Sequence, residues 1–493
     1  MSAAVDVVRD VRKIGNCGGV TDVVAYLMLS RHRDDVDVQK ECLRVLGNLC
    51  IGNFEIKRLA GERGAMQAVV DAMKRHGGND KVLEYGCLAL GNMCYDNADN
   101  RRRAGECGAI KAVVRAMKRH PGNEEIREYG CASLVNMCHE NDENKRLAGQ
   151  RGAIEAVVDA MKRHGGNDKI RRYGCAALRN MCCDDKNKRL AGQRGAIEAV
   201  VDAMKRHRGN DKIQEDGCAA LRNMCCDDEN ERLAGQRGAI EAVVDAMKRH
   251  GENEEIQEDG CAALRNMCDD NVENRRRAGA RGAIKAVVDA MKRHGGIDKV
   301  QMYGCIALRK MCYENAENQY EAASLDACQI ALQAMELFPA VEPEALKLCA
   351  LLTKSDVNTP AAEGQNSTHA SSREEQLERE LRAMQIKLTE LEQQVAAAAK
   401  TKTKEHKPKP TAQKSTGKEN HKEEQRRATA TDARTNAHDA AEARQRAAQN
   451  RGRPRAAENR EQPPLRRQEA NNPHDPRNWS VKKAESIARD WMN

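Results

Sequence analysis

The stretch NKRLAGQRGAIEAVVDAMKRH occupies residues 144–164 and returns unchanged at residues 187–207. Near variants of its GAIEAVVDAMKRH part begin, 43 or 44 residues apart, at Gly64, Gly108, Gly152, Gly195, Gly238 and Gly282. A second segment, close to YGCAALRNMC, recurs in step with the first, with its glycine at Gly86, Gly130, Gly174, Gly217, Gly260 and Gly304. Self-similarity at a fixed period of this length is the signature of a protein built from stacked structural repeats.

Each period predicts three helices. In the unit that starts near residue 143, residues 143–150 form a short first helix, and Gly152 makes the turn into a second helix at 153–163. The second helix has a single apolar face, made by Ile154, Val157, Val158 and Met161. The sequence HGGN ends it. A third helix follows at about 168–182, with acidic Asp168 favourably placed at its N-terminal end.

The third helix is apolar on two adjoining stripes, and a helix of this kind is buried on two sides. It therefore forms the middle of a stack, in which each unit buries the faces of its neighbours. The cysteines recur seven residues apart on one of these stripes, which predicts core packing rather than the short loops and convergent ligands of a zinc site. The pairs are 87/94, 131/138, 175/182, 218/225, 261/268 and 305/312. Cys183 and Cys226 follow two of these pairs and are expected to be exposed.

The period, the glycine turn and the ALxNM pattern of the third helix resemble the armadillo repeat family, which includes importin-alpha and beta-catenin. The resemblance implies an all-α fold: a right-handed superhelical solenoid of about eight three-helix repeats over residues 1–355, with a divergent eighth unit. The sequence departs from the family at Gly61, Gly105, Gly149 and their equivalents, where an aliphatic residue is usual. Glycine inside a helix costs about 1 kcal/mol relative to alanine, so we expect the first-helix layer to be loose.

Composition divides the rest of the chain. Residues 356–372 read as a polar linker, and residues 373–399 carry a seam of apolar residues spaced for a short coiled coil. This segment could form a weak homodimer or a single helix that folds back on the solenoid. Residues 400–472 have the composition of a disordered basic region. Residues 473–493 hold both tryptophans and could form a short amphipathic docking helix or a frayed tail.

Charge and cysteine content bear on location. The net charge is +8, and residues 401–493 hold 22 Lys and Arg against 13 Asp and Glu, so the basic character belongs to the tail. No apolar stretch is long enough to span a membrane, and the first residues do not resemble a signal peptide. Twenty cysteines in such a chain favour a reducing compartment. We expect a cytoplasmic protein, with the nucleus as a second location, and no membrane insertion.

An asparagine recurs on the third helix of six units and is replaced by Lys310 in the seventh. Its amide can bond both polar groups of an extended peptide backbone, and in armadillo proteins the matching asparagines line a concave peptide-binding groove. The alternative is that these amides bond nearby helix ends. The asparagines are Asn48, Asn92, Asn136, Asn180, Asn223 and Asn266.

Two further positions share the helical face of these asparagines. Seven residues before the asparagine come Glu41, Tyr85, Tyr129, Tyr173, Asp216, Asp259 and Tyr303. Four residues after it come Asp96, Glu140, Asp184, Asp227, Asp270 and Glu314. These residues predict a groove that is rich in tyrosine at first and acidic throughout, suited to a basic extended segment. The tryptophan that grips lysine in importin-alpha has no counterpart here, which argues against a role in nuclear import.

A Lys-Arg-His sequence ends the second helix in six units. This recurrence predicts a basic ridge along the stack. Its central members are Lys162, Arg163, Lys205, Arg206, Lys248 and Arg249. Such a ridge could bind phosphate groups or nucleic acid. Cations at a helix C-terminus also complement the helix dipole, and an i, i+4 pair such as Asp159–Arg163 stabilises the helix.

These patterns predict a non-enzymatic scaffold that binds an extended, basic segment of a protein partner. The alternative is a nucleic-acid or phosphate binder that uses the basic ridge and tail. The sequence offers no phosphate loop, nucleophile motif, paired acid and base or metal-ligand cluster, so we expect no enzyme activity, no cofactor and no metal.

Overall fold

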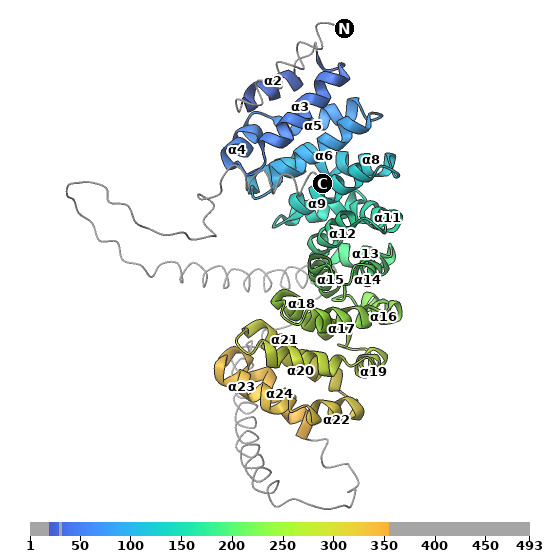
Figure 1. Cartoon of the computed structure of the whole chain (residues 1–493), viewed down its shortest axis with the longest axis vertical. Helices are drawn as coiled ribbons and strands as arrows, with labels where there is room; N and C mark the ends of the chain where they lie inside the picture. Colours follow the sequence, from blue (N-terminus) through green and yellow to red (C-terminus); the bar gives the residue numbers. More distant parts are fainter. Residues whose placement is uncertain (1–18, 29–31, 354–493) are drawn as a thin grey trace, which may run out of the picture. The chain divides into compact units, whose positions relative to one another are not determined.

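The computed structural model describes residues 19–28 and 32–353, and every regular element within these residues is a helix. Successive units of three helices stack one after another along the chain (Figure 1). The first helices are α4 (Phe54–Glu62), α7 (Ala98–Cys107), α10 (Asp142–Gln150), α13 (Asp185–Gln193), α16 (Asp228–Arg237), α19 (Val272–Ala280) and α22 (Ala316–Ser324).

The other two helices of each unit complete the stack. The second helices are α2 (Val20–Met28), α5 (Ala65–Arg75), α8 (Ala109–Arg119), α11 (Ala153–Arg163), α14 (Ala196–Arg206), α17 (Ala239–Arg249), α20 (Ala283–Arg293) and α23 (Ala327–Leu337). The third helices are α3 (Val36–Leu49), α6 (Asp80–Cys94), α9 (Glu124–Cys138), α12 (Asp168–Met181), α15 (Asp211–Met224), α18 (Glu254–Met267), α21 (Asp298–Cys312) and α24 (Glu342–Thr353). A 3-10 turn, η2 (Pro339–Val341), precedes α24.

The ends of the helices follow local rules. In the fourth unit, Asn141 and Asn167 cap α10 and α12, and each side chain accepts a hydrogen bond from a backbone N–H of the first turn. Gly152 lies between α10 and α11 with φ +75°, a left-handed conformation that glycine adopts without strain. The predicted helix bounds of this unit therefore agree with the structure to within one residue.

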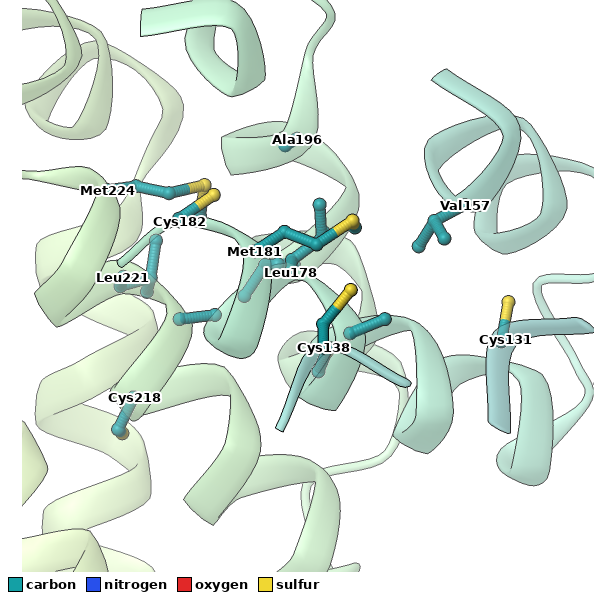
Figure 2. Close-up of a cluster of buried hydrophobic side chains, with 14 of the residues drawn as sticks. Cys131, Cys138, Val157, Leu178, Met181, Cys182, Ala196, Cys218, Leu221 and Met224 are labelled. Carbon is teal, nitrogen blue, oxygen red and sulfur yellow. The ribbon is translucent and has the colours of Figure 1, made fainter. Parts of the chain in front are cut away.

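The core runs through the stack as one continuous cluster, with each third helix packed between the third helices of its two neighbours. Figure 2 labels Cys131, Cys138 and Cys182 in the buried cluster that also contains Leu178 and Met181. Burial raises the pKa of the Cys131 thiol to about 12, so the thiol stays protonated and packs as a small apolar group. The prediction of a cysteine core is confirmed, and Cys183 and Cys226 are exposed as expected.

The prediction of a loose first-helix layer is wrong. A buried asparagine of each following unit packs against the glycine of the first helix: a Cβ added at Gly192 would lie 1.7 Å from Oδ1 of Asn230. The amide nitrogen of Asn230 donates to the carbonyls of Lys188 (2.7 Å) and Met224 (3.0 Å). The glycine thus makes room for an inter-repeat hydrogen-bond network. Its asparagines are Asn100, Asn144, Asn187, Asn230, Asn274 and Asn318.

Eight units are visible, because α22–α24 continue the register of the seventh unit. The predicted linker (356–372), coiled coil (373–399), disordered basic region (400–472) and terminal helix (473–493) lie outside the described residues. No helix among residues 19–28 and 32–353 is long and apolar enough to cross a membrane.

Candidate functional site

The third-helix asparagines form a ladder across the stack. Each amide nitrogen donates to a backbone carbonyl near the end of the preceding third helix: Asn92 to Gly47 (3.1 Å), Asn136 to Gly91 (3.0 Å), Asn180 to Val135 (3.1 Å), Asn223 to Arg179 (2.9 Å) and Asn266 to Arg222 (2.8 Å). These carbonyls lie in the last turns of their helices, and those of Gly91 and Val135 also accept from the backbone N–H groups of Tyr95 (3.0 Å) and His139 (3.1 Å). The ladder therefore adds a hydrogen bond between units at each helix end. Sequence reasoning named this role as the alternative to peptide binding.

The amide oxygens divide the ladder into two parts. In Asn223 and Asn266 the oxygen accepts from the side chain of the preceding arginine, at 3.4 Å and 2.9 Å. No hydrogen bond from a described residue reaches the amide oxygens of Asn92, Asn136 and Asn180, and none of these oxygens is a buried unsatisfied atom. An acceptor therefore remains for a ligand in the second to fourth units.

The two ends of the ladder differ from its middle. Asn48 is exposed at the end of α3. Lys310, which replaces asparagine in the seventh unit, forms an ion pair with Asp269 of the preceding unit. The repeating amide contact is therefore confined to the second to sixth units.

Tyr85, Tyr129 and Tyr173 lie half-buried on the same layer of helices as Asn92, Asn136 and Asn180. Burial, together with the carboxylates of Glu128 and Glu84, raises the pKa of Tyr129 to about 12, so its hydroxyl remains a hydrogen-bond donor at neutral pH. The three predicted tyrosines thus lie on the same helices as the three asparagines that keep an amide oxygen, two turns before them.

The prediction of a groove that is acidic throughout is wrong for the fifth and sixth units. Arg179 of α12 forms an ion pair with Asp216 of α15 (2.9 Å), and Arg222 pairs in the same way with Asp259 of α18. Burial raises the pKa of each of these two carboxyls to about 6, and the paired arginine offsets part of that effect. Arg265 continues the series, with its guanidinium 5.5 Å from the ring centre of Tyr303. Glu41 is likewise buried and paired with Arg44 (2.6 Å).

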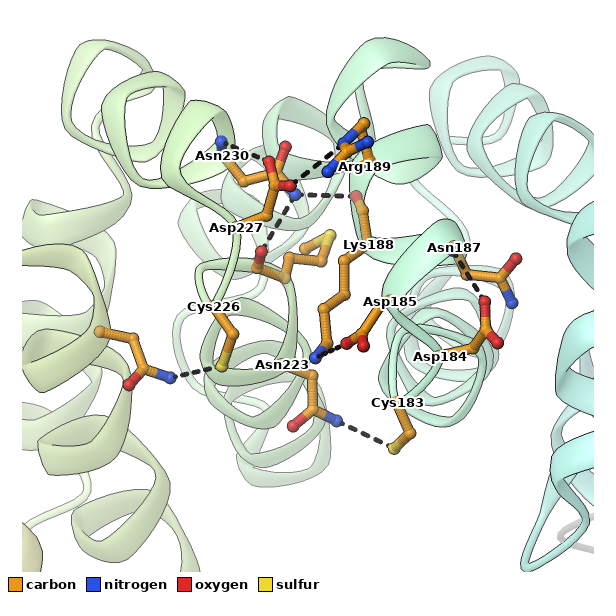
Figure 3. A network of polar contacts seen from close by, with 12 residues as sticks. Cys183, Asp184, Asp185, Asn187, Lys188, Arg189, Asn223, Cys226, Asp227 and Asn230 are labelled. Atoms are coloured by element: carbon orange, nitrogen blue, oxygen red, sulfur yellow. Dashed lines mark hydrogen bonds and ion pairs between the residues drawn. The ribbon is translucent and has the colours of Figure 1, made fainter. Parts of the chain in front are cut away.

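The acids four residues after the asparagine also serve local structure. Asp184 and Asp227 cap α13 and α16, and their carboxylates accept from the backbone N–H of Asn187 (3.0 Å) and Asn230 (3.4 Å) (Figure 3). Arg189 lies 3.4 Å from the Asp227 carboxylate. Asp96, Glu140 and Glu314 have positive φ in the turns after longer third helices, and Asp270 is exposed. Most of the predicted negative charge is therefore used by caps and ion pairs.

The residues of the basic ridge are exposed, but their arginines are paired. Arg163 lies 2.8 Å from Asp159, Arg206 lies 2.8 Å from Asp202, and Arg249 lies 3.8 Å from Asp245. The Nζ atoms of Lys162 and Lys205 lie close to Gly195 and Gly238 in the next unit, and Lys248 donates to the carbonyl of Arg281 (3.5 Å).

The histidines of the ridge join successive units. His164 and His207 donate from Nε2 to the carbonyls of Pro121 (3.0 Å) and Gly165 (3.1 Å) of the preceding unit. The Lys-Arg-His sequence therefore has a clear structural role. Among residues 19–28 and 32–353, no group of three or more His, Cys, Asp or Glu side chains could hold a metal ion.

A stack of three-helix units with a glycine turn, a central layer of third helices and an asparagine ladder defines a helical solenoid of the armadillo type. A family model described as the GAC ARM domain matches residues 9–178, and a model described as the LRRK2 ARM repeat matches residues 188–405. The chain belongs to the armadillo repeat family.

Solved structures show the same fold. An engineered protein from a structural genomics consortium has a TM-score of 0.60 and 18% sequence identity, over 72% of this chain and 86% of that chain. A structure from work on a phosphorylation switch that controls the interaction between cadherin and beta-catenin has a TM-score of 0.58 and 19% identity, over 68% of this chain and 61% of that chain. At this identity the likeness establishes the fold alone. No curated protein matches the chain in sequence.

Proposed function

We propose that this chain is a protein-interaction scaffold that binds an extended segment of a partner protein along the third helices of its second to fourth units. The observation that carries the proposal is the set of free amide oxygens on Asn92, Asn136 and Asn180, on helices that also carry three half-buried tyrosines. An extended backbone presents an N–H group at every residue, and the amide oxygens are acceptors for such groups.

Each ladder amide is anchored through its nitrogen, which limits the conformational entropy that binding would cost. Tyrosine adds a large amphipathic contact with few rotatable bonds. A structure with the same fold comes from work on an interaction between two proteins. The ion pairs of Arg179 with Asp216 and Arg222 with Asp259 leave less free acceptor capacity in the fifth and sixth units.

The test begins with peptides of about twelve residues selected from a random display library on the full chain. Affinity for a selected peptide is then measured for Asn136→Ser and Asn266→Ser. Both variants lose the same inter-repeat bond, at 3.0 Å and 2.8 Å. Asn266→Ser also loses the bonds of Asn266 to Arg265 (2.9 Å) and Cys226 (3.1 Å), so the control variant carries the larger structural cost. We expect Asn136→Ser to weaken binding about tenfold, the cost of one buried hydrogen-bond partner, and Asn266→Ser to leave affinity unchanged.

Tyr129→Ala should weaken the same peptide, whereas Tyr303→Ala in the seventh unit should not. If the two asparagine variants lost equal affinity, or if neither lost any, the proposed segment would be the wrong one.

A further inference from the structure

Two arginines of the third helices are inserted between the second helices. The guanidinium of Arg127 is fully buried and donates to the carbonyl of Ala156 (3.1 Å) and to the carboxylate of Asp159 (2.7 Å), both on α11. Arg171 repeats this arrangement in the next unit: it is 1% exposed and donates to the carbonyl of Ala199 (3.2 Å) and to Asp202 (2.6 Å) on α14. The stack therefore contains two copies of a guanidinium-binding site with a known occupant.

The same position in the fifth unit is Gln214, whose shorter side chain turns back to its own unit. Its amide donates to the carbonyls of Met204 (3.0 Å) and His207 (2.9 Å). A cavity of about 290 Å³ lies between α14 and α17, and its walls include Ala242 and Asp245. These two residues hold the register positions of Ala199 and Asp202. The cavity therefore has the acceptors that the two buried arginines use.

The other units show how the space between second helices varies with the third-helix residue at the position of Gln214. Where Gln39 holds the position, a cavity of about 410 Å³ lies beside Ala68 and Asp71. Where apolar Leu83 holds it and Arg115 stands in place of the aspartate, the space is about 20 Å³. Between α17 and α20, the guanidinium of Arg293 lies against Gly251 instead. Of the two larger cavities, the one beside Asp245 has neighbouring turns that are all described.

Asp245 is more weakly paired than its counterparts. Its nearest cations are Arg208 at 3.6 Å and Arg249 at 3.8 Å. Asp159 and Asp202, by contrast, receive a buried guanidinium at 2.6–2.7 Å. The wall also includes Glu241, whose Oε1 pairs with Arg281 (3.0 Å) while its Oε2 is buried without a partner. Acceptor capacity for a cation remains in this cavity.

The cations around the cavity do not exclude a guanidinium. Lys205, Lys248 and Arg281 have counterparts at the Arg171 site in Lys162, Lys205 and Arg237, and that site holds a guanidinium. The added cation is Arg208, which stands where the fourth unit has Gly165. A Cβ at Gly165 would lie 2.7 Å from a terminal nitrogen of Arg171. The fourth unit thus has Gly165 and Arg171 at the two positions where the fifth unit has Arg208 and Gln214.

We propose that the cavity between α14 and α17 binds the guanidinium group of an arginine side chain, with Asp245 and the carbonyl of Ala242 as its acceptors. A guanidinium fits because it is planar, weakly hydrated and able to donate in two directions at once, whereas an ammonium is a compact and strongly hydrated charge. The site lies between second helices, so it is separate from the third-helix surface of the proposed function and does not depend on it.

The experiment titrates N-acetyl-arginine amide and N-acetyl-lysine amide into the full chain carrying 13C-labelled methionine methyl groups. The methyl signal of Met204, in the cavity wall, reports binding. We expect a saturable shift with the arginine compound and at least tenfold weaker binding of the lysine compound. Asp245→Asn should weaken the arginine compound about tenfold, and Arg208→Gly should strengthen it by removing a competing cation.

The decisive variant is Gln214→Arg with Arg208→Gly, which recreates the arrangement of Arg171 and Gly165. The chain's own guanidinium should fill the cavity, so binding should be lost while the Tm stays equal to or above that of the original chain. Equal binding of the two compounds, unchanged affinity in Asp245→Asn, or wild-type binding by this double variant would each overturn the proposal.

A further arm identifies the source of the arginine. A full-length variant with the arginines of residues 401–493 changed to lysine should bind the added compound more tightly if the chain supplies the group itself. Unchanged binding would assign the group to another molecule.

Discussion

The third helices carry two different surfaces on one scaffold. The second to fourth units carry Tyr85, Tyr129 and Tyr173, and the corresponding residues of the units before them, at the register position of Arg179, are Gly47, Gly91 and Val135. In the fifth and sixth units the tyrosine becomes Asp216 or Asp259, and the preceding unit offers Arg179 or Arg222. We call these the tyrosine segment and the arginine segment. In the second to sixth units, the residue at the tyrosine or aspartate position therefore varies together with the residue at the arginine position of the unit before it.

This difference shows that the repeating pattern is fixed by contacts between neighbours rather than within a unit. An aspartate at this position is buried, and burying an unpaired carboxylate is costly. It is therefore found only where the preceding unit supplies an arginine. The tyrosine needs no such partner: the preceding unit has a small or apolar residue for Tyr85, Tyr129 and Tyr173, and Arg265 for Tyr303. The ion pairs occupy the polar side chains of the arginine segment. In the tyrosine segment, the amide oxygens of Asn92, Asn136 and Asn180 accept no hydrogen bond from a described residue.

The largest expected effect comes from breaking one ion pair. Arg222→Ala should lower the free energy of unfolding by about 2–3 kcal/mol, because it leaves the carboxylate of Asp259 buried without its partner. Arg265→Ala is the control, since it removes a contact with the ring of Tyr303 that is worth about 0.5–1 kcal/mol. Urea unfolding of the full chain followed by circular dichroism measures both. Similar losses in the two variants would contradict the distinction between ion pair and ring contact.

The pH dependence of stability should separate the segments next. Burial raises the pKa of Asp216 and Asp259 to about 6 in the folded chain, whereas an unfolded aspartate titrates near 4. Between about pH 4 and pH 6 the folded state therefore binds more protons than the unfolded state, so stability falls as the pH rises through this window. We expect a loss of about 2–3 kcal/mol for each carboxyl, since one pKa unit corresponds to about 1.4 kcal/mol.

The double variant Asp216→Asn, Asp259→Asn should have a flatter profile between pH 4 and pH 6, because neither position then titrates. A variant whose profile kept the slope of the original chain would show that these carboxyls do not carry it. The measurement is a series of urea unfolding curves for both proteins across this pH range.

The smallest effect comes from converting one segment into the other. The double variant Arg222→Val, Asp259→Tyr copies the pair Val135 and Tyr173 from the tyrosine segment, and we expect its free energy of unfolding to lie within about 1 kcal/mol of the original. Arg222→Val alone should be clearly less stable, since it strands Asp259. Equal stabilities of the single and double variants, measured by thermal unfolding, would show that the match between units is unimportant.

The sequence predicted the solenoid, the helix bounds and the cysteine core, because these follow from periodicity within one unit. It missed the arginines at 179, 222 and 265 and the buried asparagines of the first helices. Both sets act between units, 37 or more residues apart. Part of the signal was present: both aspartates at this position, Asp216 and Asp259, follow a unit in which an arginine precedes the ladder asparagine. Aligning the repeats in register hides such a relation, because the two partners fall in different rows and different columns.

The glycine of the first helix has one more consequence, because it decides where an asparagine of the following unit can make its contact. Gly279 accommodates Asn318 of the unit that follows. The position one period later is Ala323, which is exposed at the end of α22. Its methyl group occupies the place where the amide oxygen of another asparagine would have to lie. Glycine at this position therefore permits the contact with an asparagine of the following unit, and within the described residues this contact extends from Gly61 and Asn100 to Gly279 and Asn318.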